Sequence, residues 1–135
     1  MFSKLINPPT IHGSSTTYSH VQATGISPTC TFITIAGQVG LDFKTGEVPS
    51  SLAEQIQVAL QNLNERLKSA GATPANLTSL THYVVDLDPN DTSRSELVVK
   101  FLAGHRPPGT LVGVAALAHP SVLYEVQATA IVHKR

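Results

Sequence analysis

The stretch SLAEQIQVALQNLNERLKSAG, residues 51–71, carries the clearest structural signal in this sequence. Ser51 is a favourable N-cap, and Glu54 follows at the spacing of a capping box. Gly71 supplies a left-handed stop at the other end. Between them, apolar side chains recur at helical spacing, at Leu52, Ile56, Ala59, Leu60, Leu63 and Leu67. This pattern predicts a helix from about Leu52 to Ala70 whose apolar stripe packs against a sheet.

Strand signals lie on both sides of this helix. Runs of β-branched and aromatic residues predict strands, and a second capping box, Ser93 with Glu96, predicts another helix that Gly104 ends. These further elements are strands at residues 18–24, 31–36, 77–87, 110–117 and 124–132 and a helix at residues 94–103. The order is β-β-α-β-α-β-β, an α+β chain with one domain over residues 1–135. Residues 1–16 are expected to form a loosely ordered N-terminal segment.

The predicted sheet has one face without cover. Right-handed strand–helix–strand crossovers place both helices on the same face of a mixed sheet. The last two strands nevertheless carry apolar residues at positions that face both ways, at Val112, Val114, Val126, Ala128 and Ala130. An uncovered apolar face needs a partner. We therefore expect this chain to associate with copies of itself.

Composition narrows the classes of partner and site. Hydrophobic residues make up 41% of the chain, and 9 basic residues balance 9 acidic ones, so no positive stripe for nucleic acid is expected. Cys30 is the single cysteine, so an internal disulfide is impossible. The six histidines lack metal-ligand spacing, and no segment approaches the roughly 20 apolar residues that span a bilayer. We expect no metal, no membrane contact and a cytoplasmic location, with a mitochondrial one left open.

Several segments together resemble one known family. They are Tyr18-Ser19-His20, Ile35-Ala36-Gly37-Gln38-Val39-Gly40, Thr45-Gly46-Glu47, Tyr83-Val84-Val85-Asp86-Leu87, Pro107-Pro108-Gly109-Thr110 and Glu125-Val126-Gln127-Ala128-Thr129-Ala130. In this order, from about Tyr18 to Val132, the chain resembles the Rid (YjgF/UK114) family. The resemblance implies a chorismate-mutase-like homotrimer whose sheets line a central barrel. Small-molecule ligands would bind in clefts between subunits, without a cofactor.

The resemblance also implies a chemistry, from which this chain departs. Typical members hydrolyse reactive enamines or imines to a keto acid and ammonia. They bind the substrate carboxylate with the arginine of a Pro-Ala-Arg-Ser/Thr motif, and Gly109 stands at that position here. Ala36 and Leu111 replace a serine and a cysteine, while Arg94 replaces an asparagine. The second glutamate of the final Glu-x-Glu pattern is Gln127.

What the pattern retains is an acid/base group. The resemblance assigns Glu125 to water positioning and proton transfer, with Tyr18 beside it as the second catalytic candidate. The expected ligand-binding residues are Ala36, Gly37, Gln38, Arg94, Gly109, Thr110, Leu111 and Gln127. Arg94 or Arg106 could supply a relocated cation, although the spacing of Arg106 turns it to the opposite face of an extended segment.

These residues favour a divergent Rid-type trimer acting on a bulkier, less charged reactive metabolite than the standard 2-aminoacrylate substrate. Hydrolytic deamination, tautomerisation, dehydration and cyclisation all use such a proton transfer, and the sequence leaves the choice open. A non-catalytic small-molecule-binding or chaperone-like trimer is one alternative. A ribonuclease or translation inhibitor is another, which the neutral charge disfavours.

Overall fold

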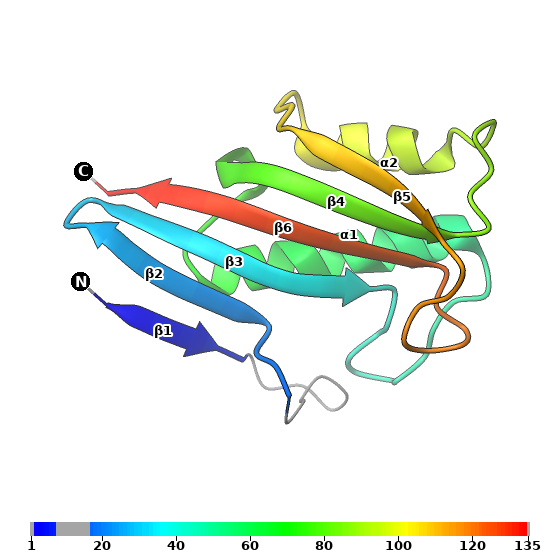
Figure 1. Ribbon diagram of the computed structural model, residues 1–135, viewed down its shortest axis with the longest axis horizontal. Helices are drawn as coiled ribbons and strands as arrows, with labels where there is room; N and C mark the ends of the chain where they lie inside the picture. The colour runs from blue at the N-terminus through cyan, green and yellow to red at the C-terminus, as the bar shows by residue number, and fades with distance from the viewer. Residues whose placement is uncertain (1, 8–16, 135) are drawn as a thin grey trace.

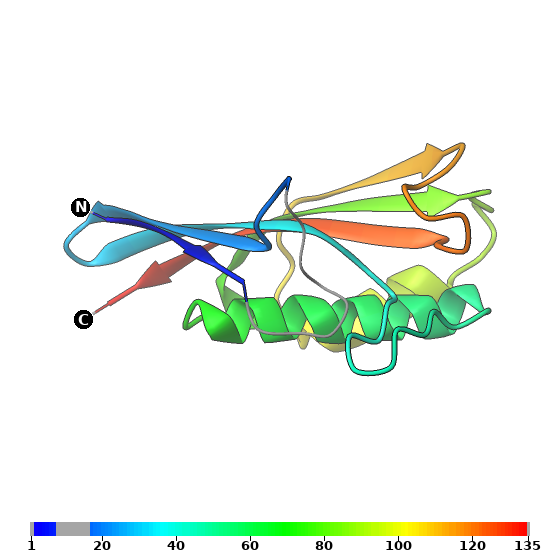
Figure 2. The same ribbon diagram turned by 90° about the horizontal axis from the view of Figure 1, so that it is seen from below.

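The computed structural model describes residues 2–7 and 17–134, which form a single α+β domain. Six strands form one mixed sheet in the order β1-β2-β3-β6-β4-β5, and both helices lie on one face of it (Figures 1 and 2). The elements are β1 (Ser3–Ile6), β2 (Val21–Ser27), β3 (Cys30–Val39), α1 (Leu52–Ser69), a short 3-10 turn (Pro74–Asn76), β4 (Leu77–Val85), α2 (Ser93–Leu102), β5 (Gly109–Val114) and β6 (Tyr124–His133). The predicted fold class is confirmed.

One strand was not predicted. Ser3–Ile6, within the segment expected to be loosely ordered, forms β1 and pairs antiparallel with β2. Its Ser-Lys-Leu-Ile sequence is short and mostly exposed, so no burial pattern reveals it. It is held by backbone pairing at the sheet edge, extended by the bond from Gly25 N to Phe2 O at 2.8 Å. Residues 8–16 of the same predicted segment lie outside the described residues.

The helix ends follow from local chemistry. Ser51 Oγ accepts a hydrogen bond from Glu54 N at 3.1 Å, as the capping box predicts, and Gly71 follows the helix with φ +75°. The predicted start of the second helix, Arg94 with Ser93 as its N-cap, was wrong by one residue. α2 begins at Ser93, and its N-cap is Thr92. Ser93 N donates instead to Asp91 Oδ1 at 2.9 Å, so a turn-forming aspartate satisfies the first amide.

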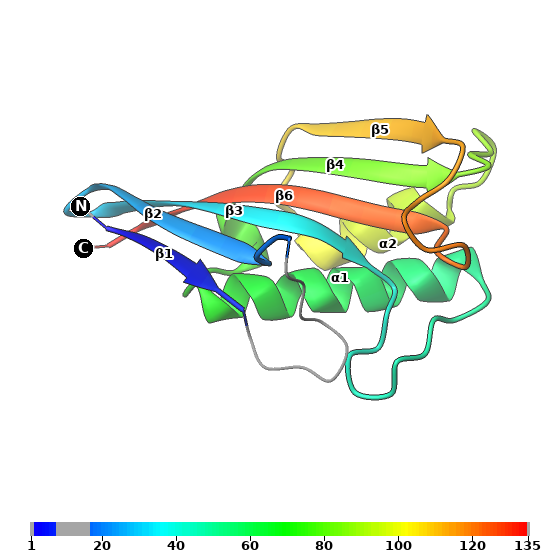
Figure 3. The ribbon, with the colours of Figure 1, turned by 60° about the horizontal axis from the view of Figure 1, so that its bottom comes forward.

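The core lies between α1 and the sheet. α1 packs across β3 and β6 (Figure 3). Its predicted stripe buries Ile56, Leu63 and Leu67 completely against strand residues such as Ile33 and Val126. No helix in the described part of the chain is long and apolar enough to cross a membrane. The expected cytoplasmic location stays a prediction.

The opposite face, here called the open face, carries no helix from the described residues (Figure 2). Val112 and Val114 lie on it, in register with Tyr83 and Val85, whereas Val126 and its apolar neighbours on β6 face the helices. Polar side chains also share this face, at Gln22, Thr34, Ser79, Thr81, Thr110, Gln127 and Thr129. The open face is therefore mixed in polarity and less apolar than the sequence suggested.

Candidate functional site

Glu125 lies on the open face at the centre of the sheet. β6 places it opposite Val39 of β3 and Tyr83 of β4, between two buried neighbours that face the helices. Its side chain is partly buried, and this burial raises the pKa of the carboxyl group. Among residues 2–7 and 17–134, the carboxyl group has no hydrogen bond or ion pair. Such a group can exchange protons with a bound molecule.

Gly37 provides the seat for this carboxyl group. Ala36 and Gly37 on β3 oppose the single residue Gln127 on β6, which is a β-bulge. A Cβ added at Gly37 would lie 2.6 Å from Glu125 Cδ and 2.9 Å from Oε1. Only glycine lets the carboxyl group lie so close to this backbone, so the structure brings together two of the residues selected from the sequence.

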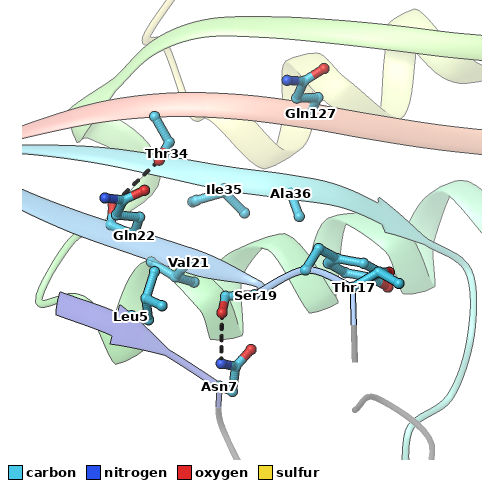
Figure 4. A pocket seen from close by; sticks show the side chains of 11 residues that line it. Leu5, Asn7, Thr17, Ser19, Val21, Gln22, Thr34, Ile35, Ala36 and Gln127 are labelled. Atoms are coloured by element: carbon cyan, nitrogen blue, oxygen red, sulfur yellow. Dashed lines mark hydrogen bonds between the residues drawn. The ribbon is translucent and has the colours of Figure 1, made fainter. Parts of the chain in front are cut away.

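A cavity of about 600 Å³ lies over the end of β1, the start of β2 and the middle of β3 (Figure 4), and neither Glu125 nor Gly37 lines it. Tyr18, Ala36 and Gln127 line it, as the sequence predicted for a ligand site. Tyr18 is 53% exposed, and Gln127 Oε1 accepts a hydrogen bond from Tyr83 Oη at 3.2 Å. The volume suits a small-molecule ligand.

Polar residues that the sequence did not single out also line this cavity. Asn7 donates to Ser19 Oγ at 3.1 Å and accepts from His20 N at 2.9 Å, so it ties the end of β1 to the start of β2. Gln22 and Thr34 add further polar groups (Figure 4). Asn7 lies in the segment expected to be loosely ordered, and no motif marks it.

The other predicted residues lie around β5, away from Glu125. Arg94 and Leu111 line a smaller cavity of about 160 Å³ on the helix side of the sheet. Thr110 lies on the open face but on the edge strand, in register with Thr81. β4 separates β5 from β6, so about 10 Å of sheet lies between the two groups. One chain does not bring them together, and Arg106, just before β5, is exposed.

Gln38 does not face the cavity. It is 1% exposed on the helix side, where its Nε2 donates to Ala36 O at 3.0 Å and lies 3.2 Å from His20 Nδ1. The bulge causes this placement: the extra residue sets Gln38 on the same face as Ile35. The bond from Gln38 to the Ala36 carbonyl supports the bulge from the helix side of the sheet.

A buried hydrogen-bonded pair joins β4 and β6 beside Leu111, which is in register with His82. His82 Nδ1 and Tyr124 Oη are 2.7 Å apart. Burial, assisted by the positive charge of Arg94, lowers the pKa of His82 to about 4, so this imidazole is neutral at physiological pH. No group of three metal-ligating side chains occurs within residues 2–7 and 17–134.

Residues 12–132 match the family described as Endoribonuclease L-PSP. The chain is a member of the Rid (YjgF/YER057c/UK114) family. It is 34% identical over 100 residues to the 2-iminobutanoate/2-iminopropanoate deaminase of Rattus norvegicus. This alignment covers 73% of this chain and 72% of the rat protein. The resemblance inferred from the sequence is thus confirmed at the level of the family.

Solved structures of other Rid proteins share the fold. A probable translation initiation inhibitor from Rhodopseudomonas palustris superposes with a TM-score of 0.84 and 26% identity, covering 98% of this chain and 99% of that one. A family member from Mycobacterium tuberculosis gives a TM-score of 0.75 and 25% identity over 97% of this chain and 100% of that one. The family includes proteins named as imine deaminases, so imine processing is a role found within it.

Proposed function

We propose that this Rid protein acts on a small reactive metabolite of the enamine, imine or enol type, with Glu125 transferring the proton. One observation carries the proposal: a partly buried carboxyl group without a hydrogen-bond partner in the described chain lies against Gly37, two residues along β6 from Gln127, which lines the 600 Å³ cavity. Burial raises the pKa of Glu125, which keeps a larger share of the group protonated near neutral pH. A carboxyl group tuned in this way serves as both acid and base.

Hydrolysis of an imine illustrates the role. The Glu125 carboxylate accepts a proton from water while the water oxygen bonds to the imine carbon, and the resulting Glu125 acid protonates the nitrogen. Glu125 then accepts the hydroxyl proton of the carbinolamine and passes it to the nitrogen, the carbon–nitrogen bond breaks, and ammonia leaves behind a carbonyl group. For an enamine, the Glu125 acid first protonates the carbon. Tyr18 and the backbone near Gly37 orient the substrate in this scheme.

The substrate we propose is bulkier and less charged than a small imino acid. Gly109 supplies no guanidinium, and charge-assisted hydrogen bonds of the kind it would make contribute about 1.5–3 kcal/mol each. Ala36 lines the large cavity and Leu111 the small one, so both add apolar surface. Arg94, beside Leu111, is the cation best placed to meet a remaining negative charge.

A homotrimer would complete the site. Within one chain, the Glu125 group and the β5 group are held on different parts of the sheet. If the β5 edge of a second copy faced the first copy's cavity, Arg94 and Thr110 could approach Tyr18 and Glu125 from outside. The open face, with its valines and hydroxyl groups, supports association of this kind.

The test measures oligomeric state and turnover together. Light scattering should give three times the chain mass, and a panel of freshly generated imines should be hydrolysed fastest when bulky and neutral. Glu125→Gln should reduce turnover at least about 100-fold. Glu65→Gln, an exposed glutamate on α1, is the matched control and should keep full activity. Full turnover by Glu125→Gln would refute the mechanism.

A binding protein without catalysis is the second candidate, favoured by the absence of a guanidinium at Gly109. It predicts ligand-induced thermal stabilisation of the trimer with no ammonia release from any imine. Ribonuclease activity, which the family description names, finds no support in the balanced charge of this chain.

A further inference from the structure

Arg66 occupies a position on α1 where the helix packs against the sheet. Its neighbours Leu63 and Leu67 are fully buried, and Arg66 itself is only 2% exposed. An arginine at such a position brings a permanent positive charge into the interior of the domain. The proposed reaction does not use it.

The contacts of Arg66 are with neutral groups. Its Nε donates to Gln38 Oε1 at 3.3 Å, and its guanidinium carbon lies 4.6 Å from the centre of the Phe43 ring. In the described part of the chain the only ion pair joins Lys68 and Glu65, on the helix surface. The charge of Arg66 therefore has no carboxylate within ion-pair distance among these residues.

One nitrogen of this guanidinium has no acceptor among residues 2–7 and 17–134. Arg66 Nη2 is buried and makes no hydrogen bond within these ranges. Buried polar atoms are nearly always hydrogen-bonded, and buried charges are nearly always paired. Burial lowers the pKa of Arg66, opposed by the nearby Glu65 and Tyr18, yet arginine keeps its proton in proteins. An acceptor on a bound molecule would satisfy this nitrogen.

Arg66 does not line the large cavity, but two chains of contacts connect it to residues that do. Gln38 bridges Arg66 to the carbonyl of Ala36, a residue that lines the cavity. A second connection runs through rings: Tyr18 lines the cavity and meets His20 edge-on at 5.7 Å, and His20 meets Phe43 edge-on at 5.8 Å.

We propose that Arg66 binds the carboxylate of a small organic acid, which reaches Nη2 from the cavity beside Tyr18. A planar guanidinium and a carboxylate match in geometry and charge, whereas a halide offers only a single point acceptor. The guanidinium lies on the helix side of the sheet and Glu125 on β6 at the open face, so the two groups are separate. It therefore stands whether or not the proposed reaction is correct.

Acetate, acetamide and chloride are the probes, applied to the full chain at constant ionic strength. Acetate should raise the thermal midpoint saturably, while acetamide, a neutral molecule of the same shape, and chloride should not. Arg66→Met should weaken acetate binding at least tenfold. Lys68→Met, which removes an exposed cation from the same helix, should leave it unchanged.

Equal responses to acetate and acetamide, or to acetate and chloride, would overturn the assignment, as would Arg66→Met binding acetate within twofold of the parent. If Arg66→Met fails to fold, the parent protein still decides the question. The arginine side-chain Nε–H resonance of Arg66 should shift saturably with acetate in an NMR titration. A resonance that does not move would refute a carboxylate site at Arg66.

Discussion

Replacing Gly37 with alanine should disable the site while leaving the fold almost intact. The new Cβ would lie 2.6 Å from Glu125 Cδ, about 0.9 Å short of the ~3.5 Å at which carbon atoms pack. The atoms that it meets belong to the end of a flexible side chain, so the carboxyl group can move away. We expect a loss of stability below about 1 kcal/mol, smaller than ordinary overpacking causes. A displacement near 1 Å, however, can reduce turnover about 100-fold.

Two assays separate these effects. Urea denaturation measures stability, and imine hydrolysis measures turnover. Gly40→Ala is the matched control. Its Cβ would lie 2.6 Å from backbone atoms of Gln55, and a helix backbone cannot move aside as a side chain can. This control should lose about 1–3 kcal/mol of stability and keep its turnover per folded molecule. If Gly37→Ala keeps full turnover, or is equally destabilised when Glu125 is already alanine, then contact with the carboxyl group is not what requires glycine.

Further predictions concern titration and specificity. The raised pKa of Glu125 means that its contribution to stability is present at low pH and is lost as pH rises through that pKa, so Glu125→Gln should flatten this part of the pH–stability curve. His82, with its pKa lowered to about 4, acts in the opposite direction: stability should fall as pH drops from about 6.5 toward 4, a loss that His82→Phe would abolish. Tyr124→Phe, which removes the 2.7 Å contact with His82, should cost about 1 kcal/mol in urea denaturation. Gly109→Arg should increase hydrolysis of small anionic imino acids, since a Cβ there meets only the Leu80 carbonyl at 3.6 Å; unchanged selectivity would show that this position does not contact the ligand.

The elements with strong side-chain periodicity were predictable from the sequence. The stripe on α1 and its cap at Ser51 appear where the spacing placed them. β1 was missed because backbone pairing holds it, and its side chains carry no burial pattern. The N-cap of α2 moved to Thr92 because Asp91 provides a turn that competes with the capping box.

The site was predictable in its residue types and less so in its geometry. Glu125, Gly37 and Tyr18 were selected through the resemblance, and the structure places Glu125 on Gly37 and Tyr18 at the cavity. Gln38 was assigned to the ligand site through the resemblance, and the bulge that turns it to the helix side is not visible in one sequence. The burial of Arg66 was not predicted, because a single arginine in an amphipathic helix is usually exposed to solvent.

The bulge at Ala36 and Gly37 has a consequence for how this protein can change. The extra residue in β3 makes room for the Glu125 carboxyl group on the open face. It also turns the Gln38 amide toward Arg66 on the helix side. Deleting that residue would reverse the facing of everything after it, so both sites would be lost in a single step. A lineage that alters one of these two sites must do so by exchanging side chains, because the number of residues in β3 determines the placement of both sites.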